Sequence, residues 1–116
     1  MTRRMIPLCL ALAASAGCAF GDYDLGEIDP AAAPERPTWS EDVAPIIDSY
    51  CASCHRAGGP SGDLGYETCE GTRRGFGSLW STVADRKSMP PGGAPRLHGY
   101  ELLVLDRWEM NGGSCD

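Results

Sequence analysis

The sequence lacks a long hydrophobic run, a strand pattern and an internal repeat. Its apolar stretch from Ile6 to Ala16 is too short for a transmembrane helix, which needs about 20 apolar residues. Because strand signals are nearly absent, the chain does not offer the alternating strands and helices that a thioredoxin-like domain requires. Large apolar side chains are also few, so a single small domain of this length needs a disulfide, a metal or a cofactor to supplement its core.

The N-terminus is typical of an export signal. Arg3 and Arg4 precede the apolar stretch, and small residues follow it. The segment 14–16, Ala-Ser-Ala, fits the small-residue rule of ordinary signal peptidase. The overlapping segment 15–18, Ser-Ala-Gly-Cys, resembles a bacterial lipobox, in which the cysteine becomes the lipidated first residue. We therefore expect a signal peptide over residues 1–17, with two cleavage sites in competition.

The cysteine count favours lipidation. Cys9 leaves with the signal, and the exported chain keeps five cysteines: Cys18, Cys51, Cys54, Cys69 and Cys115. Cys69 and Cys115 lie outside the Cys51–Cys54 motif and most simply form a disulfide in an oxidising compartment. Such a bond would close a loop of about 45 residues and contribute about 4 kcal/mol through lost chain entropy. Cys18 is then left over, and a thioether to lipid removes its exposed thiol. We expect an exported lipoprotein in the bacterial periplasm or on the cell surface.

Residues 18–37 combine acidic residues and prolines with little apolar material. Such a segment buries too little surface to offset the entropy of ordering, so we expect a flexible tether. Without Arg3 and Arg4 the chain carries 8 basic residues (10 − 2) and 16 acidic ones, a net charge of −8. This charge repels nucleic acid and anionic membrane, and it favours a partner protein with a basic docking surface. Contact with the membrane would therefore be through the lipid anchor alone.

The remaining residues, 38–116, show helical periodicity at both ends. Val43, Ile46, Ile47 and Tyr50 form one apolar stripe, and Thr38 lies at capping distance from Glu41. Because Pro45 belongs in a first turn, we expect regular helix to begin near Asp42.

The middle of this domain is richer in glycine. Residues 56–77 contain seven glycines, a composition that predicts loop, and residues 78–85 predict a short helix that buries Leu79, Trp80 and Val83. Residues 99–110 predict a final helix with Leu102, Leu105 and Trp108 inward, ended by Asn111 and Gly112. The expected fold class is all-α, with about three helices and long loops.

The segment Cys51-Ala52-Ser53-Cys54-His55 carries the strongest chemical signal. A zinc knuckle needs a second closely spaced pair of ligands, which Cys69, Cys115 and His98 do not provide. Attachment of a c-type haem needs two thiols that reach its vinyl groups and a histidine beneath the iron, and this segment contains all three. The export signal agrees, because this haem is attached outside the bacterial cytoplasm. The sequence therefore predicts one covalent haem c, bound through Cys51 and Cys54.

Residues 38–116 resemble small class I c-type cytochromes, especially the haem domains of bacterial outer-surface lipoproteins. The resemblance rests on the Cys51–His55 motif, on Met89 before two prolines, and on the closing helix with Trp108 before Asn111 and Gly112. It implies a cytochrome c-like fold in which His55 is the proximal iron ligand and Met89 the distal one. It also implies that the first and last helices cross through an aromatic contact, for which Tyr50 and Trp108 are available.

Met89 is also a plausible ligand on physical grounds. Its flanking prolines keep the backbone extended and rigid, so that a thioether facing the iron loses little entropy. His98 would instead give bis-histidine ligation, although its place near the start of the last helix favours an exposed residue, and Met110 at the end of that helix is expected to be structural.

With both axial positions of the iron occupied, no site is open for a substrate, so the expected function is single-electron transfer without catalysis. Two alternatives stay open. If Met89 is displaceable, the iron would bind a gas or a peroxide, as in a sensor or an enzyme. If no haem is attached, the chain would be a structural zinc module.

The lipid anchor predicts that Cys18→Ser releases the protein from the membrane fraction, because no other exported segment is lipophilic enough to hold it there. Fractionation followed by mass spectrometry of the N-terminus measures this. A wild-type protein that is already in the soluble fraction, or that begins at Gly17, would show that ordinary signal peptidase cleaves the chain.

Overall fold

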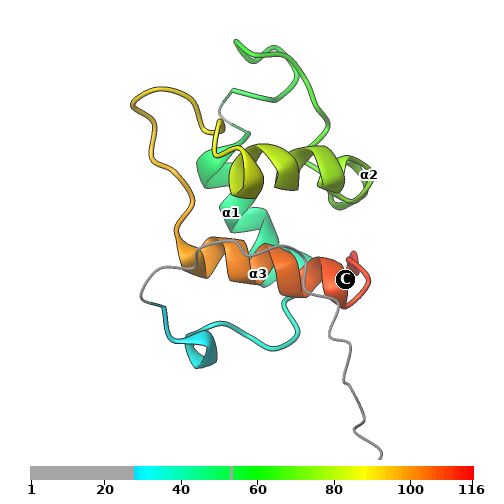
Figure 1. Cartoon of the computed structure of the whole chain (residues 1–116). Helices are drawn as coiled ribbons and strands as arrows, with labels where there is room; N and C mark the ends of the chain where they lie inside the picture. The colour runs from blue at the N-terminus through cyan, green and yellow to red at the C-terminus, as the bar shows by residue number, and fades with distance from the viewer. Residues whose placement is uncertain (1–27, 53) are drawn as a thin grey trace, which may run out of the picture.

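The computed structural model describes residues 28–52 and 54–116, and in these residues it contains helices and no strand (Figure 1). The expected all-α class is therefore confirmed for this part of the chain. Three α-helices are joined by loops and by short helical turns: η1 (Pro30–Ala32), η2 (Trp39–Val43), α1 (Ala44–Tyr50), α2 (Cys69–Trp80), η3 (Ser81–Asp85) and α3 (Gly99–Met110). No helix in the described ranges is long and apolar enough to cross a membrane.

The first helical segment begins with the predicted cap. The Oγ1 atom of Thr38 accepts a hydrogen bond from the backbone N–H of Glu41 at 3.2 Å, and the carboxylate of Asp42 accepts one from the N–H of Thr38 at 2.8 Å. Regular α-helix begins at Ala44, with Pro45 in its first turn as expected. The predicted stripe faces the core: Val43, Ile46 and Ile47 are buried and Tyr50 is half-buried.

Helix α2 begins at Cys69, where the glycine content predicted loop, so the prediction of loop over 69–77 was wrong. The Oγ1 atom of Thr68 caps the helix by accepting a hydrogen bond from the N–H of Gly71 at 3.0 Å. A Cβ atom at Gly71 would clash with the carbonyl oxygen of Gly65. Glycine is therefore required here for close packing of α2 on the preceding loop, and not for a turn.

Helix α3 agrees with its prediction. Leu102, Leu105 and Trp108 are buried, and the chain leaves the helix through Gly112 and Gly113, both at positive φ.

The aromatic contact of α3 differs from the expected one. The ring of Trp108 lies 5.8 Å from that of Trp39 and 6.1 Å from that of Phe76, centroid to centroid. The hydroxyl of Tyr50 instead donates a hydrogen bond to Glu101 Oε1 at 3.0 Å. The first and last helical segments are thus joined by two tryptophans, because η2 adds a turn before α1 and packs the half-buried Trp39 against the core.

The second half of the predicted tether is packed against α3. Arg107 Nη1 donates hydrogen bonds to the carbonyl oxygens of Ala33 at 2.8 Å, Pro30 at 3.1 Å and Pro34 at 3.2 Å. Ala33 is buried in the core. Residues 28–37 therefore pack against the helical unit that was predicted to begin at residue 38. The signal peptide 1–17, Cys18 and the rest of the tether lie outside the described residues.

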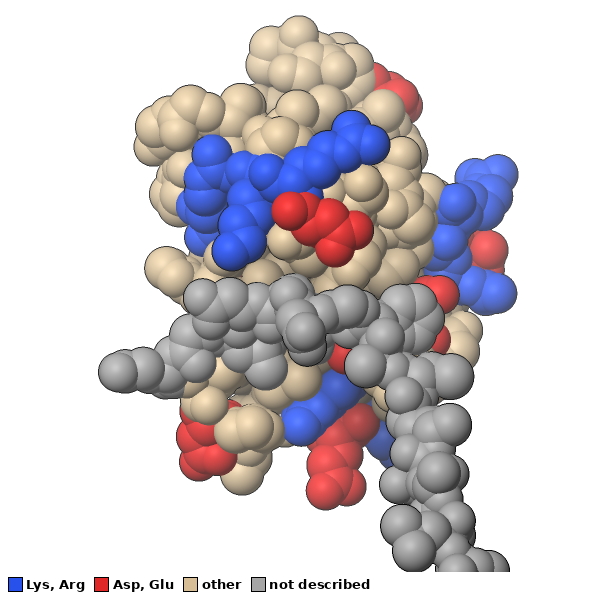
Figure 2. Space-filling view, in the orientation of Figure 1, with Lys and Arg blue, Asp and Glu red and all other residues tan. Residues whose placement is uncertain are grey.

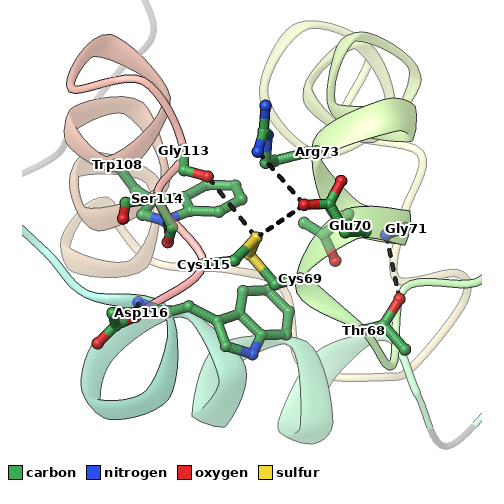
Figure 3. Close-up of a disulfide and its surroundings, with 12 residues drawn as sticks. Thr68, Cys69, Glu70, Gly71, Arg73, Trp108, Gly113, Ser114, Cys115 and Asp116 are labelled. Carbon is green, nitrogen blue, oxygen red and sulfur yellow. Dashed lines mark hydrogen bonds and ion pairs between the residues drawn. A yellow bond between two sulfur atoms is a disulfide. The ribbon is translucent and has the colours of Figure 1, made fainter.

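Cys69 and Cys115 form the expected disulfide, with their Cα atoms 5.6 Å apart (Figure 3). The bond joins the first turn of α2 to the C-terminal tail. The same tail accepts a hydrogen bond from Trp108 Nε1 at the carbonyl of Ser114, 3.1 Å away, and the carboxylate of Asp116 accepts one from the N–H of Trp39 at 2.8 Å. One short tail thus connects α2, α3 and η2.

Removing this bond with Cys69→Ser and Cys115→Ser should destabilise the fold by about 4 kcal/mol, because the unfolded chain regains the entropy of an open loop. Thermal unfolding followed by circular dichroism measures the change. Reduction of the wild-type disulfide should lower the unfolding temperature to a similar extent and leave the double variant unaffected. An unchanged unfolding temperature in the double variant would show that the noncovalent contacts of the tail suffice.

Candidate functional site

A cavity of about 340 Å³ opens between the end of α1, the C-terminal half of α2 with η3, and the loop 89–95. Its volume is at the lower end of the range that is common for small-molecule and cofactor sites. The walls are mainly apolar, with leucine, valine and proline side chains. In Figure 1 the loop that follows η3 runs to the start of α3, and Met89, Pro90, Pro91, Ala94 and Pro95 of this loop line the cavity.

The two cysteines and the histidine of the motif line this cavity together. Helix α1 ends at Tyr50, and the chain then turns tightly: the N–H groups of Cys54 and His55 donate hydrogen bonds to the carbonyl oxygen of Cys51 at 3.2 and 3.0 Å. This turn brings residues three and four positions apart to the same wall. Ser53, inside the motif, lies outside the described residues.

His55 has one ring nitrogen that calls for a bond partner. Within residues 28–52 and 54–116, Nδ1 of His55 is a buried side-chain atom without a hydrogen-bond partner. Buried polar atoms in native proteins are nearly always paired, so an unpaired one needs an explanation. An imidazole nitrogen beside an apolar cavity is suited to bind a metal ion that a cofactor carries into it.

Burial raises the pKa of the Cys51 thiol to about 11. The side chain is only 9% exposed. At neutral pH Cys51 is therefore a protonated thiol, whereas attack on a disulfide requires the thiolate. This environment disfavours a redox dithiol and is compatible with a cysteine that is consumed in a thioether.

The part of the chain that the structure describes contains no group of three or more His, Cys, Asp or Glu side chains that could share a metal ion. A structural zinc ion needs four such ligands. Haem iron needs far fewer from the protein, because the porphyrin occupies the equatorial positions and leaves two axial ones. The donor set at this cavity therefore fits a haem better than a zinc ion.

Met89 lies on the same cavity as the motif, with 36% of its surface exposed. Its loop is attached to η3, because the N–H groups of Ser88 and Met89 both donate to the carbonyl oxygen of Thr82, at 2.9 and 3.2 Å. Pro90, directly after Met89, is buried and lines the cavity as well.

The other candidate ligands lie elsewhere. His98 is exposed at the start of α3, where its N–H donates to Glu101 Oε2 at 3.1 Å, and it is not among the residues that line the cavity. Met110 is 62% exposed at the end of α3. Of the three residues considered as the second iron ligand, Met89, His98 and Met110, only Met89 lines the cavity together with His55.

Two tyrosines of the cavity were not recognised as site residues from the sequence. Tyr50 is raised in pKa by burial and by its hydrogen bond to Glu101. Tyr66 lines the cavity from the loop before α2, and burial is the main cause of its raised pKa, followed by repulsion from the Cys51 thiolate, which forms only at high pH. The sequence signal for Tyr66 was an aromatic residue inside a glycine-rich segment. The glycine against which its ring packs, Gly75, follows nine residues later, so no local pattern linked the two.

Comparisons with protein families, curated proteins and solved structures find no match to this chain.

Proposed function

We propose that this chain is an exported monohaem c-type cytochrome that transfers single electrons and is tethered to a membrane by a lipid on Cys18. The observation that carries the proposal is the gathering of Cys51, Cys54, His55 and Met89 on one apolar cavity, with a buried nitrogen of His55 in need of a partner. The two cysteines would attach a haem covalently, and the histidine and the methionine would bind its iron.

The thiols of Cys51 and Cys54 would hold the cofactor covalently as thioethers. His55 and the Met89 thioether would be the protein ligands of its iron. When bound, the haem supplies a reversible one-electron change at its iron. The apolar walls exclude water, and a thioether ligand favours a higher reduction potential than a second imidazole would.

The cavity also suits the energetic needs of the domain. A small chain leaves a large share of its surface in contact with water and has little core to stabilise it. A bound haem would add apolar contacts where three separate segments meet, which the disulfide alone does not do. The net charge of −8 after signal removal, from 8 basic (10 − 2) and 16 acidic residues, favours a redox partner with a basic surface.

A second candidate function follows from the exposure of Met89. A ligand with 36% of its surface open to solvent, on a loop held mainly at its first residues, is more easily displaced than a buried one. Displacement would let the iron bind a gas or a peroxide, as in a sensor or an enzyme. Carbon monoxide binding to the reduced wild-type protein at neutral pH would favour this function over electron transfer.

The attachment residues give the first test. Cys51→Ala with Cys54→Ala should abolish haem that survives acid–acetone extraction, after expression with haem-maturation machinery, because no thiol remains in the motif. The matched control is Cys69→Ser with Cys115→Ser, which removes two other cysteines and should keep its haem. Covalent haem in the Cys51/Cys54 double variant would refute the assignment.

The distal ligand gives the second test. Met89→Ala should open the sixth position of the iron, lower the reduction potential and allow carbon monoxide to bind, because no other thioether of the described residues lies on the cavity. Visible spectra and redox titration measure these changes. His98→Ala serves as the control and should behave as wild type. A Met89→Ala protein with an unchanged low-spin spectrum and potential would assign the sixth position to another residue.

A further inference from the structure

Lys87 has an unusual backbone conformation beside the loop that carries Met89. Among the residues that the structure describes, it is the only one other than glycine with a positive φ, at 52°. This angle lies in the left-handed region, which glycine enters freely and in which the Cβ atom of other residues is crowded. Because backbone strain of this kind collects at functional sites, a lysine in this conformation calls for an explanation.

Lys87 lies where the chain leaves η3 for the loop that leads to α3 (Figure 1). Arg86 caps the end of η3 by donating its N–H to the carbonyl oxygen of Ser81 at 2.9 Å, so Lys87 is the first residue beyond the cap. Helices often end with a left-handed residue at this position, and that residue is usually glycine. The chain contains 15 glycines and still has a lysine here, so the turn is made despite its side chain.

The turn at Lys87 brings the chain back onto η3. The N–H groups of Ser88 and Met89 both donate to the carbonyl oxygen of Thr82, at 2.9 and 3.2 Å. In a continued helix, Met89 would instead lie about 10 Å further along the axis than Thr82. The reversal thus keeps Met89 beside Thr82, and both residues line the cavity.

The base of this turn is fixed to the rest of the fold. Val83 and Ala84 of η3 are buried and form one cluster with Leu102 of α3. The side chain of Thr82 is attached as well, because its Oγ1 donates to the carbonyl oxygen of Leu79 at 2.8 Å. The carbonyl oxygen of Thr82 is therefore held in place, and the direction of the loop depends on the residue at which the chain turns.

We propose that Lys87 is a positioning residue of the site: its left-handed backbone turns the loop so that the Met89 side chain stays on the cavity. This inference rests on the proposed haem site and adds a residue outside both the motif and the axial ligands. The backbone conformation carries this role and the charge does not, because the side chain of Lys87 is exposed and makes no ion pair or hydrogen bond with the described residues.

The first experiment measures how firmly Met89 is held, with added imidazole as a competitor for the sixth position of the iron in the oxidised holo-protein. Lys87→Val should raise the affinity for imidazole about fivefold or more, because a β-branched residue is strained at positive φ and the loop then leaves its place more easily. Arg86→Val is the matched control. It introduces the same side chain one residue earlier, at a φ of −84°, and should bind imidazole as wild type does. An unchanged affinity in Lys87→Val would overturn the inference.

The second experiment separates backbone conformation from charge. Lys87→Gly and Lys87→Asn both remove the charge, but glycine and asparagine adopt the left-handed conformation more readily than other residues. Both variants should keep the low-spin spectrum and bind imidazole no more tightly than wild type. If either variant bound imidazole as tightly as Lys87→Val, the lysine side chain would be responsible, and the inference would be overturned.

Failure of this inference and failure of the proposed function are distinguishable. A wild-type protein without covalent haem would refute the cytochrome assignment, and this inference with it, before any titration. A haem-bearing wild type that binds imidazole as tightly as Met89→Ala would refute Met89 as the ligand that Lys87 positions. A haem-bearing protein in which Lys87→Val changes nothing would refute the role of Lys87 alone.

Discussion

The indole of Trp108 is fully buried where η2, α2 and the C-terminal tail meet α3, and the other contacts of the fold are arranged around it. Its ring packs on Trp39 and Phe76, and its N–H donates to the carbonyl of Ser114. The disulfide then keeps that tail beside α2 (Figure 3). A small domain gains most from such a residue, since one large side chain buries apolar surface against several segments at once.

Continuous helical segments link the core around Trp108 to the cavity. Segment η2 leads directly into α1, which delivers Cys51 at its end, and α2 continues into η3, whose Thr82 carbonyl holds the loop of Met89. The cavity is thus framed by α1 and α2, which share one core, and by η3, whose Val83 and Ala84 form a second small cluster with Leu102. Figure 2 shows acidic and basic side chains scattered over the face seen in Figure 1, with Lys and Arg gathered near the loop after η3.

The glycines show where composition misleads. Counted together, the glycines of residues 56–77 predict loop, and those before residue 69 do lie in loop. Gly71 and Gly75 lie inside α2, because the helix passes so close to Gly65 and Tyr66 that a Cβ atom would clash. Helix propensity counts against glycine by about 1 kcal/mol, and tertiary packing outweighs that cost here. Composition also misled for residues 28–37. Their proline-rich sequence predicted a flexible tether, but their carbonyl groups accept hydrogen bonds from Arg107, more than 70 residues later.

Local patterns in the sequence were sufficient for the helices near both ends of the domain, for the cap at Thr38 and for the stop after Met110. These features depend on neighbours within one or two turns, so periodicity and spacing describe them. The pairing of Cys69 with Cys115 followed from counting, because few cysteines remained. Only the tertiary structure decided that Met89 and not His98 lies on the cavity, that Trp39 is the partner of Trp108, and that Tyr66 belongs to the site. Each of these is a contact between segments far apart in the chain, and such a contact is set by how closely two backbones approach, which no local pattern records.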